Sequence, residues 1–189
     1  MLRGAIALAG AAMLLPLVSG RALALDASAA ETFVRETVDE VLALVRSSAS
    51  ARDKADRFQA IMERRGAMEN IARFAIGKDA WGAMSGDQQA RYTEAFSHYL
   101  ATAYARRFSE YSGQEVEIGR SRDLGSRGVE VGSVVQGAGQ APIEVVWYVS
   151  DRPGRTVLVD LKIEGVSMVI TLRDEIGEIH KGQGRDIEK

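Results

Sequence analysis

The stretch IEVVWYVSDRPGRTVLVDLKI, residues 143–163, decides the fold class of this 189-residue chain. Its apolar side chains fall on alternate positions before and after the turn-forming residues 151–154, which read Asp-Arg-Pro-Gly. Successive side chains of a strand point to opposite faces of a sheet, so this alternation is typical of strands with one buried face. Two such strands joined by a short turn predict an antiparallel hairpin.

The same pattern occurs nearer the N-terminus, after Gly113. Val116 and Ile118 alternate with glutamates, and Val129 and Val131 flank another glutamate. Antiparallel sheets commonly keep one face on the core and one face toward water, which produces this alternation. We therefore expect a curved antiparallel sheet of about four strands, arranged as a meander.

Helical spacing replaces the alternation in the first half of the chain, where apolar residues recur three and four positions apart. Two segments open with a capping-box pattern, Ser28 with Glu31 and Ser85 with Gln88. Helices followed by strands predict an α+β fold, with N-terminal helices packed on the curved sheet and a short C-terminal helix after it. The expected helices cover residues 28–45, 53–65, 68–76 and 85–111, with the last one starting at Thr171.

Residues 1–24 have the pattern of a secretory signal peptide. Arg3 supplies the positive charge, residues 6–18 form a short apolar stretch, and Ala22-Leu23-Ala24 matches the small-residue cleavage pattern. The apolar stretch is short for a membrane-spanning helix, which needs about 20 residues. We expect cleavage after Ala24, export to the periplasm of a Gram-negative bacterium, and a single domain at 25–189.

The composition excludes several kinds of chemistry. The chain has no cysteine, two histidines and a net charge of −2. A disulfide scaffold, a cysteine nucleophile and a thiolate metal site are therefore excluded, and the weak charge argues against nucleic-acid binding. The sequence also lacks a G-x-S-x-G elbow, an H-E-x-x-H pair and a phosphate-binding loop. We expect no enzyme activity, no cofactor and no metal, and we interpret His98 as a helix-surface residue.

One helix carries a stripe of aromatic residues that allows two interpretations. The helix could pack its apolar side on the sheet, or this side could line one wall of an apolar ligand cavity. The sequence leaves both open. The stripe comprises Tyr92, Phe96, Tyr99, Leu100, Tyr104, Phe108 and Tyr111.

The segment DLKIEGVSM at 160–168, followed by Arg173 and Lys181-Gly182, resembles the MlaC family. These proteins are also called toluene-tolerance auxiliary proteins, and the hopanoid-associated HpnM proteins are relatives. Ala75-Ile76-Gly77, Trp81 and the aromatic stripe agree with the family in order, so the resemblance covers roughly residues 30–182. Family members usually have a tryptophan where this chain has Thr156.

The resemblance implies a monomeric periplasmic lipid shuttle that holds phospholipid acyl chains in an apolar cavity between helices and sheet. Its implied partners are an outer-membrane lipoprotein–porin complex and the inner-membrane MCE-domain protein of an ABC transporter. A carrier of hopanoids or another hydrophobic molecule is the alternative, and an enzyme on a similar cone-shaped α+β fold is a further one.

A cavity wall needs apolar side chains but no hydrogen-bonding groups at fixed positions, so both halves of the chain supply candidates. Simple core packing is an equally good interpretation of each, and a one-residue slip in a strand would turn its set outward. Arg173 and Ser167 are the candidates for headgroup contact. The lipid-binding candidates are Ile76, Trp81, Phe96, Leu100, Tyr104, Phe108, Val145, Trp147, Val157, Val159, Leu161 and Met168.

Overall fold

The structure is a computed structural model of the chain, and it describes residues 25–111, 113–137, 139, 141–151 and 154–182. The expected signal peptide at 1–24 lies outside the described residues. Within the described ranges, no helix is both long enough and apolar enough to cross a membrane.

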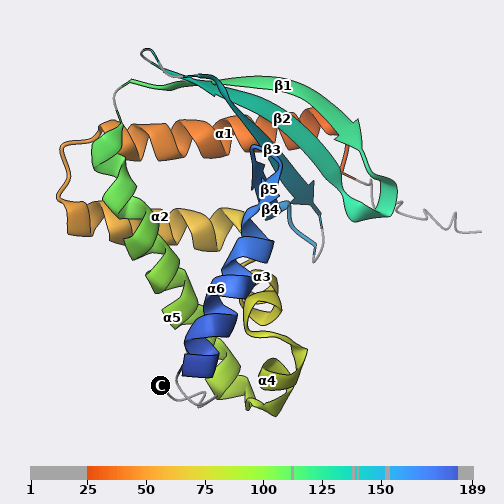
Figure 1. The fold of residues 1–189 in the computed structure, drawn as a ribbon. Coiled ribbons are helices and arrows are strands. Elements are labelled where there is room, and N and C mark those ends of the chain that lie inside the picture. The colour runs from red at the N-terminus through yellow and green to blue at the C-terminus, as the bar shows by residue number, and fades with distance from the viewer. Residues whose placement is uncertain (1–24, 112, 138, 140, 152–153, 183–189) are drawn as a thin grey trace, which may run out of the picture.

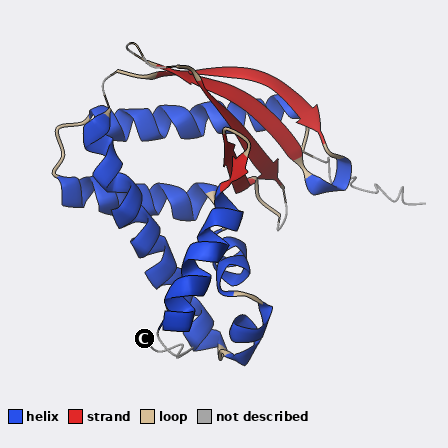
Figure 2. Ribbon diagram, in the orientation of Figure 1, coloured by secondary structure: helices blue, strands red, loops and turns tan. Residues whose placement is uncertain are grey.

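The described residues fold into six α-helices and one five-stranded sheet (Figures 1 and 2), which confirms the expected α+β class. The helices are α1 (Ala27–Arg46), α2 (Ala51–Arg65), α3 (Met68–Ile76), α4 (Lys78–Ala83), α5 (Gly86–Ala105) and α6 (Met168–Gly182), with 3₁₀ helices η1 (Arg106–Glu110) and η2 (Gly125–Arg127). The strands are β1 (Glu115–Asp123), β2 (Val129–Gln136), β3 (Ile143–Ser150), β4 (Val157–Ile163) and β5 (Val166–Ser167).

The sheet is a meander in which consecutive strands pair antiparallel in the order β1-β2-β3-β4-β5. Trp147 of β3 lies opposite both Val131 of β2 and Leu161 of β4. Register shifts after Ile118 in β1 and between Leu158 and Asp160 in β4 interrupt the ladder. Such bulges bend a strand and increase its twist, and the sheet curves over α1 in Figure 1. The expected meander is confirmed, with β5 as an additional two-residue strand.

The capping-box pattern predicts the start of α5 correctly and the start of α1 wrongly. At α5, Ser85 accepts a hydrogen bond from the Gln88 N–H at 3.2 Å, and the Gln88 side chain accepts one from the Ser85 N–H at 2.8 Å. The predicted box at Ser28 is wrong, because the N-cap of α1 is Asp26, whose Oδ1 accepts from the Ala29 N–H at 2.7 Å. Aspartate and serine cap helices about equally well, so the sequence did not distinguish these starts.

Helix α6 begins at Met168, three residues earlier than predicted, because Ser167 is its N-cap. The Ser167 hydroxyl accepts from the Ile170 N–H at 3.2 Å and donates to Asp160 Oδ2 at 2.7 Å. Asp160 Oδ1 in turn accepts from the Val169 N–H at 3.1 Å. Asp160 of β4 and Ser167 therefore satisfy the helix start together and fix α6 to the sheet.

The turn between β4 and β5 accounts for two further residues of the same motif. Glu164 has φ of 49° and Gly165 has φ of 80°, and the turn pairs Ile163 with Val166. Two consecutive left-handed residues are the requirement of the tight hairpin turn that matches strand twist. The Glu-Gly pair thus reverses the chain so that Ser167 returns beside Asp160.

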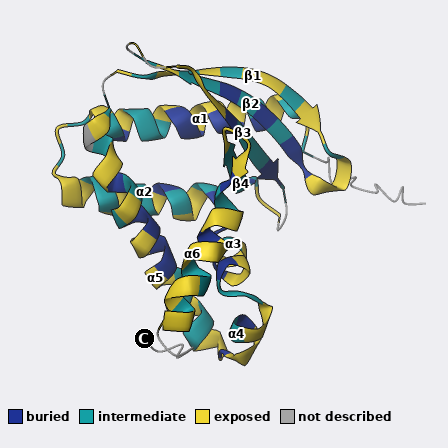
Figure 3. Ribbon diagram, viewed as in Figure 1, coloured by how far each residue is buried: buried dark blue, intermediate teal, exposed yellow. Residues whose placement is uncertain are grey.

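The described buried apolar residues form two separate cores. Figure 3 colours the ribbon by the burial of each residue. In the sheet core, α1 lies against β2 and β3; its buried members are Ala30, Phe33, Val34, Val38, Val129, Val131 and Val149. The helical core is built by α3, α4, α5 and α6; its buried members are Met68, Ala72, Ala75, Trp81, Met84, Phe96, Leu100 and Leu172. Helix α1 therefore covers the sheet, whereas the later helices pack chiefly on one another.

The interpretation that the aromatic helix packs on the sheet is wrong. Phe96 and Leu100 of α5 lie in the helical core, together with Trp81 of α4 and Leu172 of α6. The aromatic stripe correctly indicated a buried helix face at Phe96 and Leu100, whereas Tyr99 is exposed and the helix ends at Ala105, before Phe108. The stripe did not identify the neighbour, because α3, α4 and α6 offer the same apolar surface as a sheet does.

Tyr92 brings an unpaired polar group to the helical core. Its ring lies 6.3 Å from that of Trp81 and 6.1 Å from that of Phe96, measured between centroids. Within the described part of the chain its buried hydroxyl has no hydrogen-bond partner, and burial raises the pKa of Tyr92 to about 12.

We expect Tyr92→Phe to raise the free energy of unfolding by about 1 kcal/mol at neutral pH, because it removes an unsatisfied buried hydroxyl. Above pH 10 the unfolded chain loses the Tyr92 proton before the folded protein does, so the wild type loses stability as the pH rises toward 12. The Tyr92→Phe variant should lose less stability than the wild type between pH 10 and pH 12. Urea unfolding at neutral and alkaline pH measures both effects. A variant less stable than the wild type at neutral pH would contradict the assignment of the Tyr92 hydroxyl as buried without a hydrogen-bond partner.

We expect Ser167→Ala to lower the free energy of unfolding by about 1–2 kcal/mol, because it removes an N-cap and the hydroxyl that donates to Asp160 Oδ2. Ser28→Ala is the matched control, since Ser28 lies in the first turn of α1 but is not its cap. Urea unfolding of both variants provides the comparison. Equal losses in the two would show that Ser167 has no special role at α6.

Candidate functional site: a hollow between α1 and α2

A hollow of about 370 Å³ lies between α1 and α2. Pockets for small ligands usually measure about 300–1,000 Å³, so this one is at the lower end of that range. Its lining residues follow the spacing i, i+3, i+4 on each helix, so each set lies on one helix face. The lining consists of Glu40, Ala43 and Leu44 from α1 and Arg57, Ala60, Ile61 and Arg64 from α2.

The interior of the hollow is apolar and its edge is charged. Leu44 is 2% exposed and Ile61 is 6% exposed, and neither is a member of the sheet core or the helical core. Ala43 and Ala60 are small and leave the space between the helices open. An apolar interior with a charged edge is suited to an amphiphile that has a hydrocarbon chain and a polar end.

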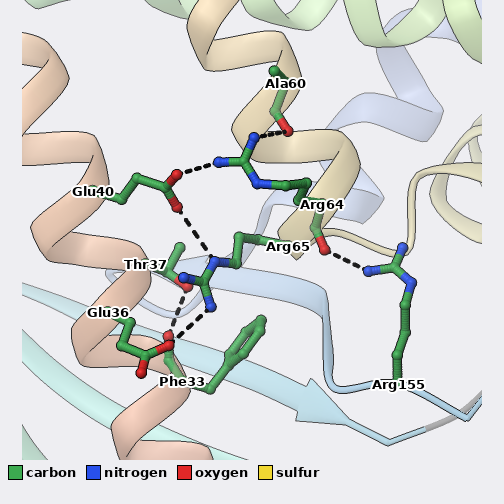
Figure 4. Close-up of polar contacts among 8 residues, drawn as sticks. All are labelled: Phe33, Glu36, Thr37, Glu40, Ala60, Arg64, Arg65 and Arg155. Atoms are coloured by element: carbon green, nitrogen blue, oxygen red, sulfur yellow. Dashed lines mark hydrogen bonds and ion pairs between the residues drawn. The ribbon is translucent and has the colours of Figure 1, made fainter.

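Ion pairs join the two helices beside the hollow (Figure 4). Arg64 pairs with Glu40. Arg65 donates from Nη1 to Glu36 Oε2 at 3.1 Å and from Nε to Glu40 Oε2 at 3.4 Å. The Arg65 guanidinium also lies 5.3 Å from the centroid of the Phe33 ring. Partly exposed pairs contribute only about 0–1 kcal/mol each, so this network sets the spacing of α1 and α2 more than it stabilises the fold.

The C-terminal end of α2 is attached to the sheet. Arg155, which precedes β4, donates to three backbone carbonyls at this end, among them that of Gly66 at 3.1 Å. The Ala67 N–H donates to the Leu158 carbonyl at 2.9 Å. A Cβ at Gly66 would lie 2.8 Å from the Met62 carbonyl oxygen, so glycine is required there. These contacts hold α2 opposite α1.

The helical lipid-binding candidates lie in and around the helical core, and the lining of the hollow between α1 and α2 includes none of them. Trp81, Phe96 and Leu100 are buried members of that core, and Ile76 and Tyr104 pack against it. The Phe108 ring contacts that of Phe58 edge-on, with 5.1 Å between centroids.

The sheet candidates divide between the two faces because of a bulge in β4. Trp147 lies opposite Leu161 and packs against the sheet core, and Val145 lies two residues earlier on the same strand. Beyond the bulge the alternation of Val157, Val159 and Leu161 fails: Leu158 lies opposite Val149 on the sheet-core side, and Val157 pairs with Ser150 instead. The predicted common face for these three β4 residues is therefore wrong.

The remaining candidates have other contacts. Ser167 is 8% exposed and its hydroxyl is used at the start of α6. Arg173 is exposed on α6, and its guanidinium lies 4.8 Å from the centroid of the Phe74 ring. Met168 is the first residue of α6 and is half-buried. Among the described residues, none of these three lines the hollow.

The sequence interpretation missed the lining of the hollow. A usable signal was present, since Arg57, Ala60, Ile61 and Arg64 occupy positions i, i+3, i+4 and i+7 of one helix. The expected helix at 53–65 includes this stripe of small, apolar and basic residues, but none of them is among the lipid-binding candidates. Only the structure shows that a second helix faces it at a distance.

Comparison with known proteins identifies the family to which this fold and sequence belong. The model of the MlaC protein family matches residues 35–188. The intermembrane phospholipid transport system binding protein MlaC of Haemophilus influenzae is 28% identical over 108 residues, which are 54% of this chain. The match spans only 50% of that relative's length.

A solved structure is similar over a longer range. The phospholipid-binding protein from Ralstonia solanacearum, determined in complex with a phospholipid, aligns with a TM-score of 0.68 and 21% sequence identity. The alignment covers 82% of this chain and 89% of that one, and it shows that the two share a fold. Because the family model matches most of the sequence, the chain belongs to the MlaC protein family.

Proposed function

We propose that the chain is a periplasmic carrier that binds a phospholipid, with an acyl chain in the hollow between α1 and α2. The observation that carries this proposal is the hollow itself, which has Leu44 and Ile61 inside and arginines at its edge, in a member of the MlaC family. The names of the Haemophilus influenzae relative and the Ralstonia solanacearum protein support the same ligand class.

The energetics of such a carrier follow from the hydrophobic effect alone. Removing a methylene from water gains about 0.8 kcal/mol, so an acyl chain of fifteen methylenes would gain roughly 12 kcal/mol if it were wholly covered. The acyl chain gains a similar free energy in a membrane. Lipid therefore leaves the bilayer only when burial in the carrier is nearly as favourable as burial in the membrane. We propose that the carrier docks to an inner-membrane MCE-domain protein of an ABC transporter and to an outer-membrane lipoprotein–porin complex. Docking to each partner then shifts the equilibrium between lipid in the carrier and lipid in the membrane.

The remaining parts of the proposal concern export and chemistry. Residues 1–24 serve as the cleaved signal peptide, and 25–189 form one lipid-binding domain that acts as a monomer. The ionisable groups lining the hollow are Glu40, Arg57 and Arg64, and Glu40 is paired with Arg64. We propose binding and release without covalent chemistry, since these groups suit a polar headgroup better than an acid–base pair.

The direct test is mass spectrometry of the purified full chain under native conditions and after denaturation, without detergent. We expect a phospholipid that dissociates when the protein unfolds. A hopanoid in the same spectrum would replace phospholipid as the cargo, and a protein without any lipid would contradict the carrier proposal.

We expect Ala60→Trp to lower the amount of co-purified lipid about tenfold, because the indole would occupy part of the space proposed for the acyl chain, and a loss of about 1.4 kcal/mol in binding is a factor of ten. Ala95→Trp is the matched control, as Ala95 is exposed on α5 and outside the hollow. Phosphorus analysis of both purified variants gives the measurement. If the two variants lose lipid equally, the acyl chain lies elsewhere.

A further inference from the structure

Helix α2 carries three arginines beside α1, and their partners differ. Arg64 pairs with Glu40 and also donates to the Ala60 carbonyl at 3.1 Å. Arg65 is bound by Glu36 and Glu40 and covers the Phe33 ring. Both guanidinium groups are thus already engaged in joining the helices (Figure 4).

Arg57 is the exception. It lines the same hollow and is exposed, and in the described ranges it has no hydrogen-bond or ion-pair partner. It lies seven residues before Arg64, which is about 10.5 Å along the helix axis at a rise of 1.5 Å per residue. The hollow therefore has one end closed by ion pairs and one end with an unpaired cation.

The charges of the lining leave a single positive charge for a ligand. Glu40 is neutralised by Arg64, and Arg57 remains. A guanidinium presents a planar set of donors that matches the oxygens of a phosphate in a two-point contact. Binding an anion at Arg64 or Arg65 would instead separate an existing pair and release Glu36 or Glu40.

We infer that Arg57 contacts the phosphate of the bound lipid and makes the hollow select phosphate-bearing amphiphiles over uncharged ones with the same acyl chains. This inference rests on the proposed function, because the acyl chain occupies the space beside Leu44 and Ile61. The phosphate then lies at the Arg57 end. The Arg64 and Arg65 pairs stay intact and keep α1 and α2 at their spacing.

The test is a competition between two lipids that differ only at the headgroup. The full chain is incubated with uncharged detergent micelles that hold equal amounts of dioleoylphosphatidylglycerol and dioleoylglycerol, re-isolated, and analysed for both lipids by mass spectrometry. We expect the wild type to prefer the phosphate lipid. Arg57→Gln should lower this preference by about threefold to tenfold, the range of one exposed, charge-assisted contact, and Arg57→Lys should retain part of it.

Arg52→Gln is the matched control, since Arg52 is an exposed arginine of α2 outside this hollow. We expect it to leave the preference unchanged. An unchanged preference in Arg57→Gln, or an equal loss in both variants, would overturn the role of Arg57. Retention of the two lipids in equal amounts by the wild type would overturn selectivity while leaving the carrier proposal in place. Retention of neither lipid would overturn both.

A separate arm offers inorganic phosphate without lipid. Free phosphate has no chain to place beside Leu44 and Ile61, so we expect no saturable binding in a calorimetric titration. Saturable binding that Arg57→Gln abolishes would mean that the site takes a free anion, and it would overturn the assignment to a lipid phosphate.

Discussion

The attachment of α2 to the sheet at Gly66 is the contact on which the rest of this structure depends. Helix α1 packs on the sheet by burying apolar side chains. The other wall of the hollow is set by Arg155, which binds the carbonyls at the end of α2, and by the hydrogen bond from Ala67 to Leu158. The last carbonyls of a helix have no partner within the helix, and Arg155 donates to three carbonyls at this end, which attaches the end of α2 to the segment before β4.

The division of the apolar residues follows from this arrangement. A chain of this size could have built one continuous core. The described residues instead form a sheet core and a helical core, and Leu44 and Ile61 belong to neither. The space that a ligand requires is therefore not a defect in a core. It lies between α1 and α2, outside the buried members of both cores.

The sequence predicted much of the fold because its signals are local. Alternation at 143–163 predicted the β3–β4 hairpin, and the Ser85 capping box predicted the start of α5. The failures concern relations between distant elements. The aromatic stripe could not identify its neighbour, and the bulge before Asp160 turned Val157 to the other face through one extra residue that the alternation did not reveal. The DLKIEGVSM motif resembles that of the family, and its Asp160, Gly165 and Ser167 have a structural explanation in the turn before α6 and the cap of α6.

The separation of the two cores has a mechanical consequence. Because no buried residue belongs to both cores, a substitution that loosens one core leaves the packing of the other in place. Helix α2 supplies no buried residue to either core. The spacing of α1 and α2 is therefore set by Leu44 and Ile61, by the ion pairs of Arg64 and Arg65, and by the attachment at Gly66.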